Sequence, residues 1–313
     1  MWKFVVLRVL VIIPILFAVI FIVFTIMNII PGNPARMILG DFATQEAIDL
    51  FNEQHGLDLP FFQRFFNYIW NIVTRFDFGI SYRTRRPVVD EIITRFPNTF
   101  NLAFFSVLGS SVIGIPAGII MAAKGKYWVD RTVNIVALVF ASVPIFILCI
   151  FVLYVFAVRL EWFPVFGIAT WRGYVLPLSV MIFPAAVGRM RMSRIVMLET
   201  IRLDYVTLAR AKGVPEHRVI FVHALKNSLI MIITSILMSF SGMLGGAIFV
   251  ENVFAIPGLG QYIILGIRMQ DTPVVMATTI FMAAIFCFNI LLLDIIYAFI
   301  DPRIKGRYMK SLR

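Results

Sequence analysis

Charged side chains are scarce in this chain of 313 residues, because only 14% of its residues are Asp, Glu, Lys or Arg. Soluble globular domains carry about 25% charged residues. Hydrophobic residues, in contrast, make up 60% of the chain. The shortage of charge therefore excludes an ordinary soluble domain and favours a protein that lies in a membrane.

Cysteine is nearly absent as well. Cys149 and Cys287 both lie in apolar runs, where a thiol usually behaves as a small buried hydrophobic side chain. The chain has neither a disulfide framework nor a Cys-x-x-Cys motif. This excludes a disulfide-stapled scaffold and a thiol-based zinc or redox site.

Residue patterns for catalysis are also missing. His217 and His223 are six residues apart and His55 is remote, so the i, i+4 pair of a helical zinc site is absent. There is no Gly-x-Ser-x-Gly nucleophile motif. The only Gly-Lys pair, in residues 125–127, is followed by Tyr where a P-loop needs Ser or Thr. We therefore expect a chain that is not an enzyme, does not itself hydrolyse ATP, and binds no metal or cofactor. A membrane enzyme is the weakest alternative.

Long apolar runs recur along the chain. A helix needs about 20 apolar residues to cross the hydrocarbon core of a bilayer, and continuous rather than alternating runs favour helices over a β-barrel. Six spans are predicted, at 9–30, 99–123, 132–158, 174–190, 229–250 and 274–300. The sequence thus predicts an all-α membrane protein with six transmembrane helices.

The positive charges decide the orientation. The fourth span is the least certain, because Arg189 follows only 14 apolar-rich residues, 174–187, that include two prolines. With six spans and both termini in the cytoplasm, 18 of the 28 Lys and Arg residues lie in cytoplasmic segments and 10 lie outside. Without the fourth span, the basic loop and tail would be outside, against the positive-inside rule. Both termini are therefore predicted to be cytoplasmic.

The spans divide the chain into four parts. Residues 1–30 form an N-terminal transmembrane helix, and 31–98 an extracytoplasmic loop with amphipathic helices. Residues 99–300 form a five-helix core that contains a cytoplasmic loop at 188–228, and 301–313 form a basic cytoplasmic tail.

The extracytoplasmic loop has local structure of its own. It begins with a turn at 31–34 and continues with a polar helix over 44–55 that Gly56 ends. Aromatic and aliphatic residues then recur with helical spacing from Phe61 to Val73. We expect this amphipathic helix to lie at the outer headgroup level or to pack on the bundle; stacking of a ligand on its rings is the less favoured alternative.

The cytoplasmic loop reads as a helix, a turn and a second helix. Tyr205, Leu208, Ala209 and Lys212 share one narrow face at i, i+3, i+4 and i+7. Gly213 follows as the C′ residue, where a left-handed conformation costs least. Pro215 suits the first position of a second helix over 215–228, which leads into the fifth span. Such a loop suits the docking of a cytoplasmic partner, or else it only fixes orientation and touches anionic headgroups.

Several segments of the chain resemble the peptide group of ABC-importer permeases. Residues 209–213 (Ala-Arg-Ala-Lys-Gly) and 223–229 (His-Ala-Leu-Lys-Asn-Ser-Leu) resemble the EAA loop of that family, although Thr207 and Leu208 replace its usual Glu and first Ala. Further similarity covers nearly the whole chain in order, at 55–60 (HGLDLP), 76–81 (FDFGIS), 86–88 (RPV), 254–261 (FAIPGLGQ), 271–275 (DTPVV) and 301–304 (DPRI).

This resemblance implies a MetI-like permease fold in the plasma (inner) membrane of a bacterium or archaeon. It implies a second homologous permease in a heterodimer, two cytoplasmic ATPase subunits that hold ATP and Mg, and an extracytoplasmic substrate-binding protein. The implied cargo is a dipeptide or oligopeptide, with nickel chelates or oligosaccharides as alternatives. The positions that the resemblance assigns to ATPase docking are Tyr205, Leu208, Ala209, Arg210, Ala211, Lys212, Gly213, His223 and Asn227.

Candidates for the translocation path are polar or small residues in the spans. They are Asn101, Ser142, Ser241, Gly245, Glu251 and Asn289. Small residues in membrane helices also serve close helix packing, so both roles stay open. Glu251, at the outer end of the fifth span, faces either a pathway mouth or solvent. The near absence of charge elsewhere in the spans disfavours a self-sufficient ion-coupled carrier or channel, which is the second alternative.

Overall fold

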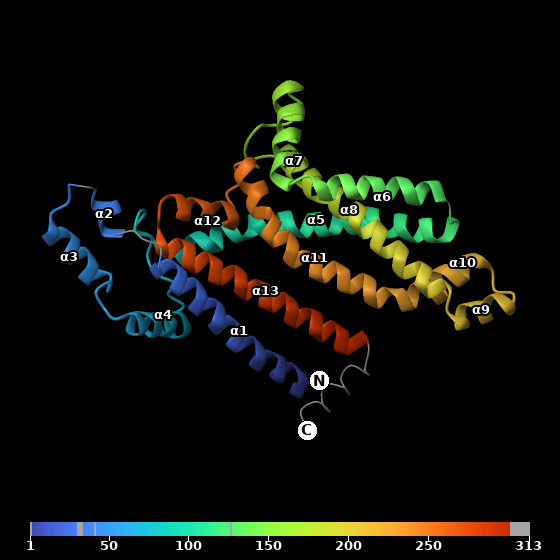
Figure 1. Ribbon diagram of the computed structural model, residues 1–313, viewed down its shortest axis with the longest axis horizontal. Helices are drawn as coiled ribbons and strands as arrows, with labels where there is room; N and C mark the ends of the chain where they lie inside the picture. Colours follow the sequence, from blue (N-terminus) through green and yellow to red (C-terminus); the bar gives the residue numbers. More distant parts are fainter. Residues whose placement is uncertain (1, 30–33, 41, 126, 301–313) are drawn as a thin grey trace. The chain divides into compact units, whose positions relative to one another are not determined.

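The computed structural model describes residues 2–29, 34–40, 42–125 and 127–300, and within these ranges every long element is a helix (Figure 1). The predicted turn at 31–34 falls largely, and the basic tail 301–313 wholly, outside the described residues. An isolated β-bridge joins Ile80 and Pro87. The all-α class is confirmed.

The elements follow one another along the chain as drawn in Figure 1. In order they are α1 Trp2–Ile29, α2 Pro34–Leu39, α3 Gln45–Gln54, α4 Phe61–Arg75, α5 Val88–Lys124, α6 Tyr127–Ser142, α7 Ile145–Val152, the π-helix η1 Leu153–Arg159, α8 Trp171–Ile201, α9 Asp204–Ala211, α10 Glu216–Arg218, the π-helix η2 Val219–Ala224, α11 Leu225–Val253, α12 Leu259–Arg268 and α13 Thr272–Ile300.

The chain divides into two compact units. Unit 1 comprises Met1–Asn98 and Pro257–Leu291, and unit 2 comprises Thr99–Ile256 and Leu292–Arg313. Unit 1 therefore joins the N-terminal helices to α12 and most of α13, although these segments are far apart in the sequence.

Within the described part of the chain, five helices are long and apolar enough to cross a membrane. The predicted span 132–158 is two pieces, Arg131–Ser142 and Ile145–Arg159, with a bend of 96° between them. Pro144 lies at the break, where it has no N–H to donate and restricts the residue before it. This span is therefore broken rather than straight, and with the bent pair taken as one crossing the number of spans is six.

Helix α8 continues 11 residues beyond position 190, the predicted end of the fourth span. The first part of the predicted loop 188–228 is thus helical. Arg189, which set the predicted end, is only 6% exposed, and its guanidinium donates to the hydroxyls of Ser111 and Ser239. Because the charge has partners inside unit 2, the helix has no need to end there.

In unit 1, α4 packs on α1 and α13, and Figure 1 shows α1 (blue) alongside α13 (red). The side chains of Phe24, Phe65 and Met276 form this small core, and the rings of Phe24 and Phe65 meet edge to face with centroids 5.4 Å apart. The packing prediction for α4 is confirmed for this face. A second face leaves Phe66 and Trp70 exposed, so a position at the headgroup level remains a prediction for that face.

The start and end of α3 follow from local chemistry. The Thr44 hydroxyl accepts a hydrogen bond from the Ala47 N–H at 3.4 Å, which caps the first turn. Gly56 follows the helix with a φ of +63°, a conformation that costs glycine least. The predicted helix over 44–55 is confirmed.

Two of the segments that carry the family resemblance meet in unit 1. Asp271, which begins the DTPVV segment, is 3% exposed. Its carboxylate accepts hydrogen bonds from the Ser81 hydroxyl at 2.5 Å and from the backbone N–H groups of Tyr82 and Arg83 at 3.2 and 3.3 Å. Asp271 therefore fixes the loop that follows α4 against the start of α13.

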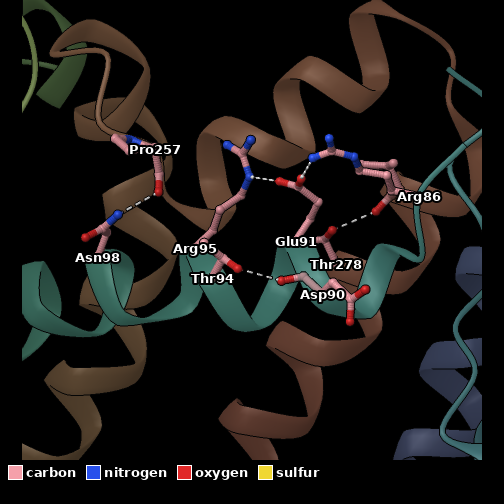
Figure 2. Close-up of polar contacts among 9 residues, drawn as sticks. Arg86, Asp90, Glu91, Thr94, Arg95, Asn98, Pro257 and Thr278 are labelled. Atoms are coloured by element: carbon pink, nitrogen blue, oxygen red, sulfur yellow. Dashed lines mark hydrogen bonds and ion pairs between the residues drawn. The ribbon is translucent and has the colours of Figure 1, made fainter. Parts of the chain in front are cut away.

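The first turns of α5 hold the PGLG segment in a similar way (Figure 2). The Arg95 Nε donates to the Glu91 carboxylate at 3.0 Å, and the Asn98 amide donates to the Pro257 carbonyl at 2.8 Å. The Arg95 guanidinium also lies 4.7 Å from the ring centroid of Tyr262. These contacts explain why residues remote in sequence belong to one unit.

We expect Asp271→Ala to lower the free energy of unfolding by about 3 kcal/mol, because one hydroxyl and two N–H groups lose a charged acceptor. Thermal unfolding in detergent measures the change. Asp58→Ala removes an exposed carboxylate from the turn before α4 and is the matched control. Equal and small shifts for the two variants would contradict the structural role of Asp271.

Candidate functional site

Helix α9 lies between α8 and α11, and it ends in a Schellman motif. The Gly213 N–H donates to the Arg210 carbonyl at 2.9 Å, and the Val214 N–H donates to the Ala209 carbonyl at 3.3 Å. Gly213 has a φ of +76°. The predicted helix and its C′ glycine are confirmed.

The motif is completed by a small apolar core. Val206, Ala209 and Val219 are buried together, and Val214 packs against them. Ala209 is 8% exposed, so it faces this core rather than a partner. The contact between the residues at C3 and C″ that accompanies a Schellman motif occupies its side chain, and its predicted docking role remains a prediction.

The other predicted docking residues lie on the surface. Those that are exposed are Tyr205, Leu208, Arg210, Ala211, Lys212, Gly213, His223 and Asn227. Leu203 and Phe221 are also exposed large apolar residues, and we did not predict them. Phe221 belongs to the π-helix η2, for which the sequence offered no signal.

An ion pair spans the turn between α9 and α10. The Arg210 guanidinium contacts the Glu216 carboxylate twice, with Nε–Oε2 at 3.1 Å and Nη2–Oε1 at 2.7 Å. The hydrogen bond that Arg210 donates to Glu216 raises the pKa of Arg210 above its ordinary value. An exposed pair contributes at most about 1 kcal/mol to stability, so its main effect is to hold the turn in one geometry. Pro215 occupies the N-cap position of α10, so the helix begins at Glu216, one residue later than predicted.

Polar and apolar contacts join the turn to the long helices of unit 2. The Ser228 hydroxyl at the start of α11 donates to Thr200 near the end of α8 at 2.9 Å. Beside this contact, Met197, Ile220 and Ala224 form a buried cluster. The segment from Thr200 to Ser228 is therefore a fixed elbow and not a loose loop.

The interior of unit 2 contains a contact that we did not predict. Besides the hydroxyls of Ser111 and Ser239, the Arg189 guanidinium donates to the Val107 carbonyl at 3.4 Å. One cation thus connects α8 with α5 and α11. A buried charge within a membrane-spanning helix is retained chiefly where it has such partners.

Helices α5 and α8 also approach one another closely along two glycines of α5. A Cβ at Gly114 would lie 2.5 Å from the Ala186 carbonyl oxygen and 3.0 Å from the Arg189 Cβ. A Cβ at Gly118 would overlap the Met190 carbonyl oxygen. The spacing is Gly-x-x-x-Gly, a pattern that lets membrane helices approach closely and that would have predicted this contact from the sequence.

The candidate pathway residues differ in their exposure and in the unit to which they belong. Ser142 and Gly245 are exposed, while Asn101 and Ser241 are half-buried. Asn289 is buried, and it belongs to unit 1 whereas the others belong to unit 2. The role of these residues remains a prediction.

Glu251 requires a correction. Its side chain is 0% exposed, and it accepts a hydrogen bond from the Thr99 hydroxyl at 2.6 Å. It therefore faces the interior of unit 2 and neither solvent nor a pathway mouth. The sequence placed it at a helix end but did not show that α5 covers that end.

Both cysteines, Cys149 and Cys287, are free and buried, in agreement with their expected role as small hydrophobic side chains. Among the residues that the structure describes, no group of three or more His, Cys, Asp or Glu side chains is placed to hold a metal ion together.

The chain matches two family models and several known proteins along nearly its whole length. Residues 114–306 match the family described as binding-protein-dependent transport system inner membrane component, and residues 1–103 match the N-terminal region of such membrane components. The chain is 38% identical over 305 residues to the glutathione transport system permease protein GsiC of Escherichia coli (strain K12) and to that of Shigella flexneri serotype 5b (strain 8401). These matches cover 97% of this chain and 99% of each relative.

The fold has a counterpart among solved structures. A chain from inward-facing conformations of the MetNI methionine ABC transporter aligns with a TM-score of 0.50 and 19% identity, over 64% of this chain and 94% of that chain. This likeness supports the MetI-like fold. The chain therefore belongs to the family of binding-protein-dependent transport system inner membrane components, as a multi-pass inner-membrane permease subunit of an ABC importer.

Proposed function

We propose that this permease carries dipeptides and oligopeptides into the cell. Two observations support this proposal. The sequence segments from 55–60 to 301–304 resemble those of the peptide group, and the GsiC relatives are named for glutathione, which is itself a small peptide. The match to those relatives extends along nearly the whole of both chains. Nickel chelates and oligosaccharides are the competing cargoes.

The chain supplies half of the translocation path in this proposal. A second, related permease supplies the other half, and an extracytoplasmic binding protein delivers the cargo to the outer loops. Residues that line the path must be exposed on the single chain, or must become exposed when the chain changes conformation. Ser142 and Gly245 are favoured among the candidates because they are already exposed.

The elbow formed by Thr200–Ser228 couples the spans to ATP. The observation that carries this proposal is that α9 is exposed at Tyr205 and Leu208 while its inner face, its C-terminus and its turn are all held in place. An ATPase subunit would receive α9 in a surface cleft, and ATP and Mg would be bound by the ATPases. A movement of the ATPases then displaces α8 and α11 directly, because no flexible loop between them absorbs the displacement.

Transport follows from a change in relative populations. ATP and the loaded binding protein must each bind one conformation more tightly than the other, because a ligand with equal affinity for both shifts nothing. The elbow gives the ATPases a mechanical connection to the spans through which that difference acts.

Reconstitution of the four partners with this chain in proteoliposomes tests the proposal. We expect the uptake of a labelled peptide to require both ATP and the binding protein. Unlabelled peptides should inhibit this uptake more strongly than oligosaccharides or nickel chelates do. Uptake without nucleotide would instead indicate a self-sufficient carrier or channel.

A pair of variants tests the docking surface in the same system. Leu208→Glu places a charge on α9 and should reduce co-purification of the ATPases at least tenfold. Leu50→Glu, on α3, is the control, because the two leucines are exposed to the same degree, 56% and 55%. Equal recovery of the ATPases with both variants would contradict docking at α9.

A further inference from the structure

Unit 1 contains a cavity of 730 Å³ beside α4. The end of α1 forms one wall, and parts of the segments 52–59, 77–82 and 272–276 form the others. This volume lies within the range of about 300–1,000 Å³ that is usual for small-molecule sites. By the predicted orientation, the cavity is on the extracytoplasmic side of the membrane.

Helix α4 presents a polar stripe to this cavity. Arg64, Asn67, Tyr68 and Asn71 all line it and recur at i, i+3, i+4 and i+7. The same helix packs Phe65 on α1 through another face. The polar stripe is visible in the sequence, but the aromatic residues of α4 are more numerous, and their pattern predicts only a headgroup or packing role for this helix.

Opposite charges stand at the two ends of the stripe. Arg64 lies near the start of α4, where its Nη1 donates to the Leu57 carbonyl at 3.4 Å. Asp77 follows the end of α4, and one of its oxygens accepts from the Gly79 N–H at 2.8 Å. The 12 residues of α4 from Arg64 to its end at Arg75 span about 16 Å, because the rise is 1.5 Å for each step from one residue to the next.

One polar group in the cavity wall points to a ligand. The Tyr68 hydroxyl is buried and has no hydrogen-bond partner among the described residues. Buried polar groups in folded proteins almost always have a partner, from the protein, from water or from a ligand. The residue lines the cavity, so the hydroxyl can gain a partner there if the side chain moves when a ligand binds.

The phenols of the cavity remain protonated donors at neutral pH. Burial, and after it the charge of Asp77, raise the pKa of Tyr68 well above its ordinary value. Burial also raises the pKa of Tyr82 to about 12, although Arg64 acts in the opposite direction.

We propose that this cavity is a binding site for a short peptide with free termini, whose carboxylate pairs with Arg64 and whose ammonium group pairs with Asp77. An extended peptide covers 3.3–3.6 Å per residue, so a length of about 16 Å accommodates up to roughly four residues. The amides of Asn67 and Asn71 lie between the charges and match the peptide backbone. The proposal rests on the peptide cargo proposed above.

Other ligand classes fit the cavity less well. A neutral oligosaccharide would leave both charges without a counterpart. A simple anion would pair with Arg64 alone and would leave Asp77 without a counterpart. A peptide with free ends is the ligand that uses both charges and the amides between them.

Binding of tetra-alanine to the complex of permeases and ATPases in detergent tests the site. The binding protein is omitted because it would bind the peptide itself. Titration calorimetry with wild-type protein should show saturable binding that weakens at least tenfold when the peptide carries a C-terminal amide or an N-terminal acetyl group, since one charge-assisted pair is lost in each case.

Protein variants then locate the two ends. Arg64→Gln should weaken binding of the free peptide at least tenfold and should make the protein indifferent to C-terminal amidation, while Asp77→Asn should do the same for N-terminal acetylation. Arg75→Gln, an exposed arginine on the same helix, and Asp58→Asn are the matched controls and should bind like wild type. Tyr68→Phe should leave the unfolding temperature unchanged, because the hydroxyl has no partner in the protein to lose.

Several outcomes would overturn the site. These are no saturable binding to the wild-type complex, binding that is insensitive to blocked termini, or binding of maltotriose in place of the peptide. Peptide uptake in proteoliposomes together with absent binding here would reject the cavity and leave the proposed function standing. Peptide binding without any peptide uptake would support the cavity and reject the proposed cargo.

Discussion

Leucine in place of Gly118 is expected to leave almost no folded permease in the membrane. A Cβ at this position would overlap the Met190 carbonyl oxygen and would lie 2.8 Å from the Ser193 Cβ and 3.1 Å from the Arg194 N. Two of these three atoms belong to the backbone of α8, so no rotation of a side chain can relieve the overlap. Extra methylenes in a packed interior cost about 1–3 kcal/mol even where side chains can adjust. Four more heavy atoms at a backbone contact should cost more.

The amount of monodisperse protein recovered in detergent measures this effect. Gly188→Leu is the matched control, because Gly188 lies on α8 itself but has no atom within 4 Å of its would-be Cβ. We expect the control to be recovered at close to the wild-type level and Gly118→Ala to fall between the two leucine variants. Normal recovery of Gly118→Leu would show that α5 and α8 are not in close contact in the folded protein.

Valine in place of Gly213 should abolish ATP-driven transport while the permease still inserts and folds. A left-handed conformation costs an ordinary residue roughly 1–2 kcal/mol, and a β-branched residue more. No atom lies within 4 Å of the position that a Cβ would take. The cost is therefore in the backbone alone and is relieved by opening the Schellman motif, which releases α9 from its fixed position.

The measurement is peptide uptake and ATP hydrolysis in the same proteoliposomes. Gly213→Asn is the control, because asparagine tolerates the left-handed region better than other side chains, and we expect it to retain most of the uptake. Loss of uptake with continued ATP hydrolysis would be the signature of uncoupling. If Gly213→Val transported peptide at the wild-type rate, the elbow would not be needed for coupling, and the proposal would be contradicted.

Elements that depend on neighbouring residues were predictable. The helix α3 begins after Thr44 and ends before Gly56, and α9 ends before Gly213, because caps and left-handed glycines act within a few residues. The six apolar runs were likewise visible, since the length of a crossing depends on composition. The docking segment followed from the same local signals.

The prolines show where local information ends. Pro144 breaks the third crossing by 96°, whereas Pro177 and Pro184 are accommodated inside α8. All three lack a backbone donor. Neighbouring helices, side chains and local adjustments decide whether a freed carbonyl in a membrane helix is satisfied again, and no window of sequence contains that information.

Buried polar groups show the same limit. The sequence indicated that a span ends near Arg189 and that Glu251 faces either a pathway mouth or solvent, but both side chains lie inside unit 2. Their partners Ser111, Ser239 and Thr99 are between 50 and 152 residues away. Rules for charge near a membrane assume contact with water or lipid, and partners from other helices remove that condition.

By itself the sequence determined the apolar runs that can cross a membrane, the caps of the short helices and the family, and it predicted the orientation, because hydrophobic length, charge balance and turn chemistry are properties of adjacent residues. Only the tertiary structure decided that Ala209 faces inward, that Asp271 ties two distant segments together, and that the polar stripe of α4 lines a cavity. These features depend on which side chains meet across helices, and that is settled by packing in three dimensions.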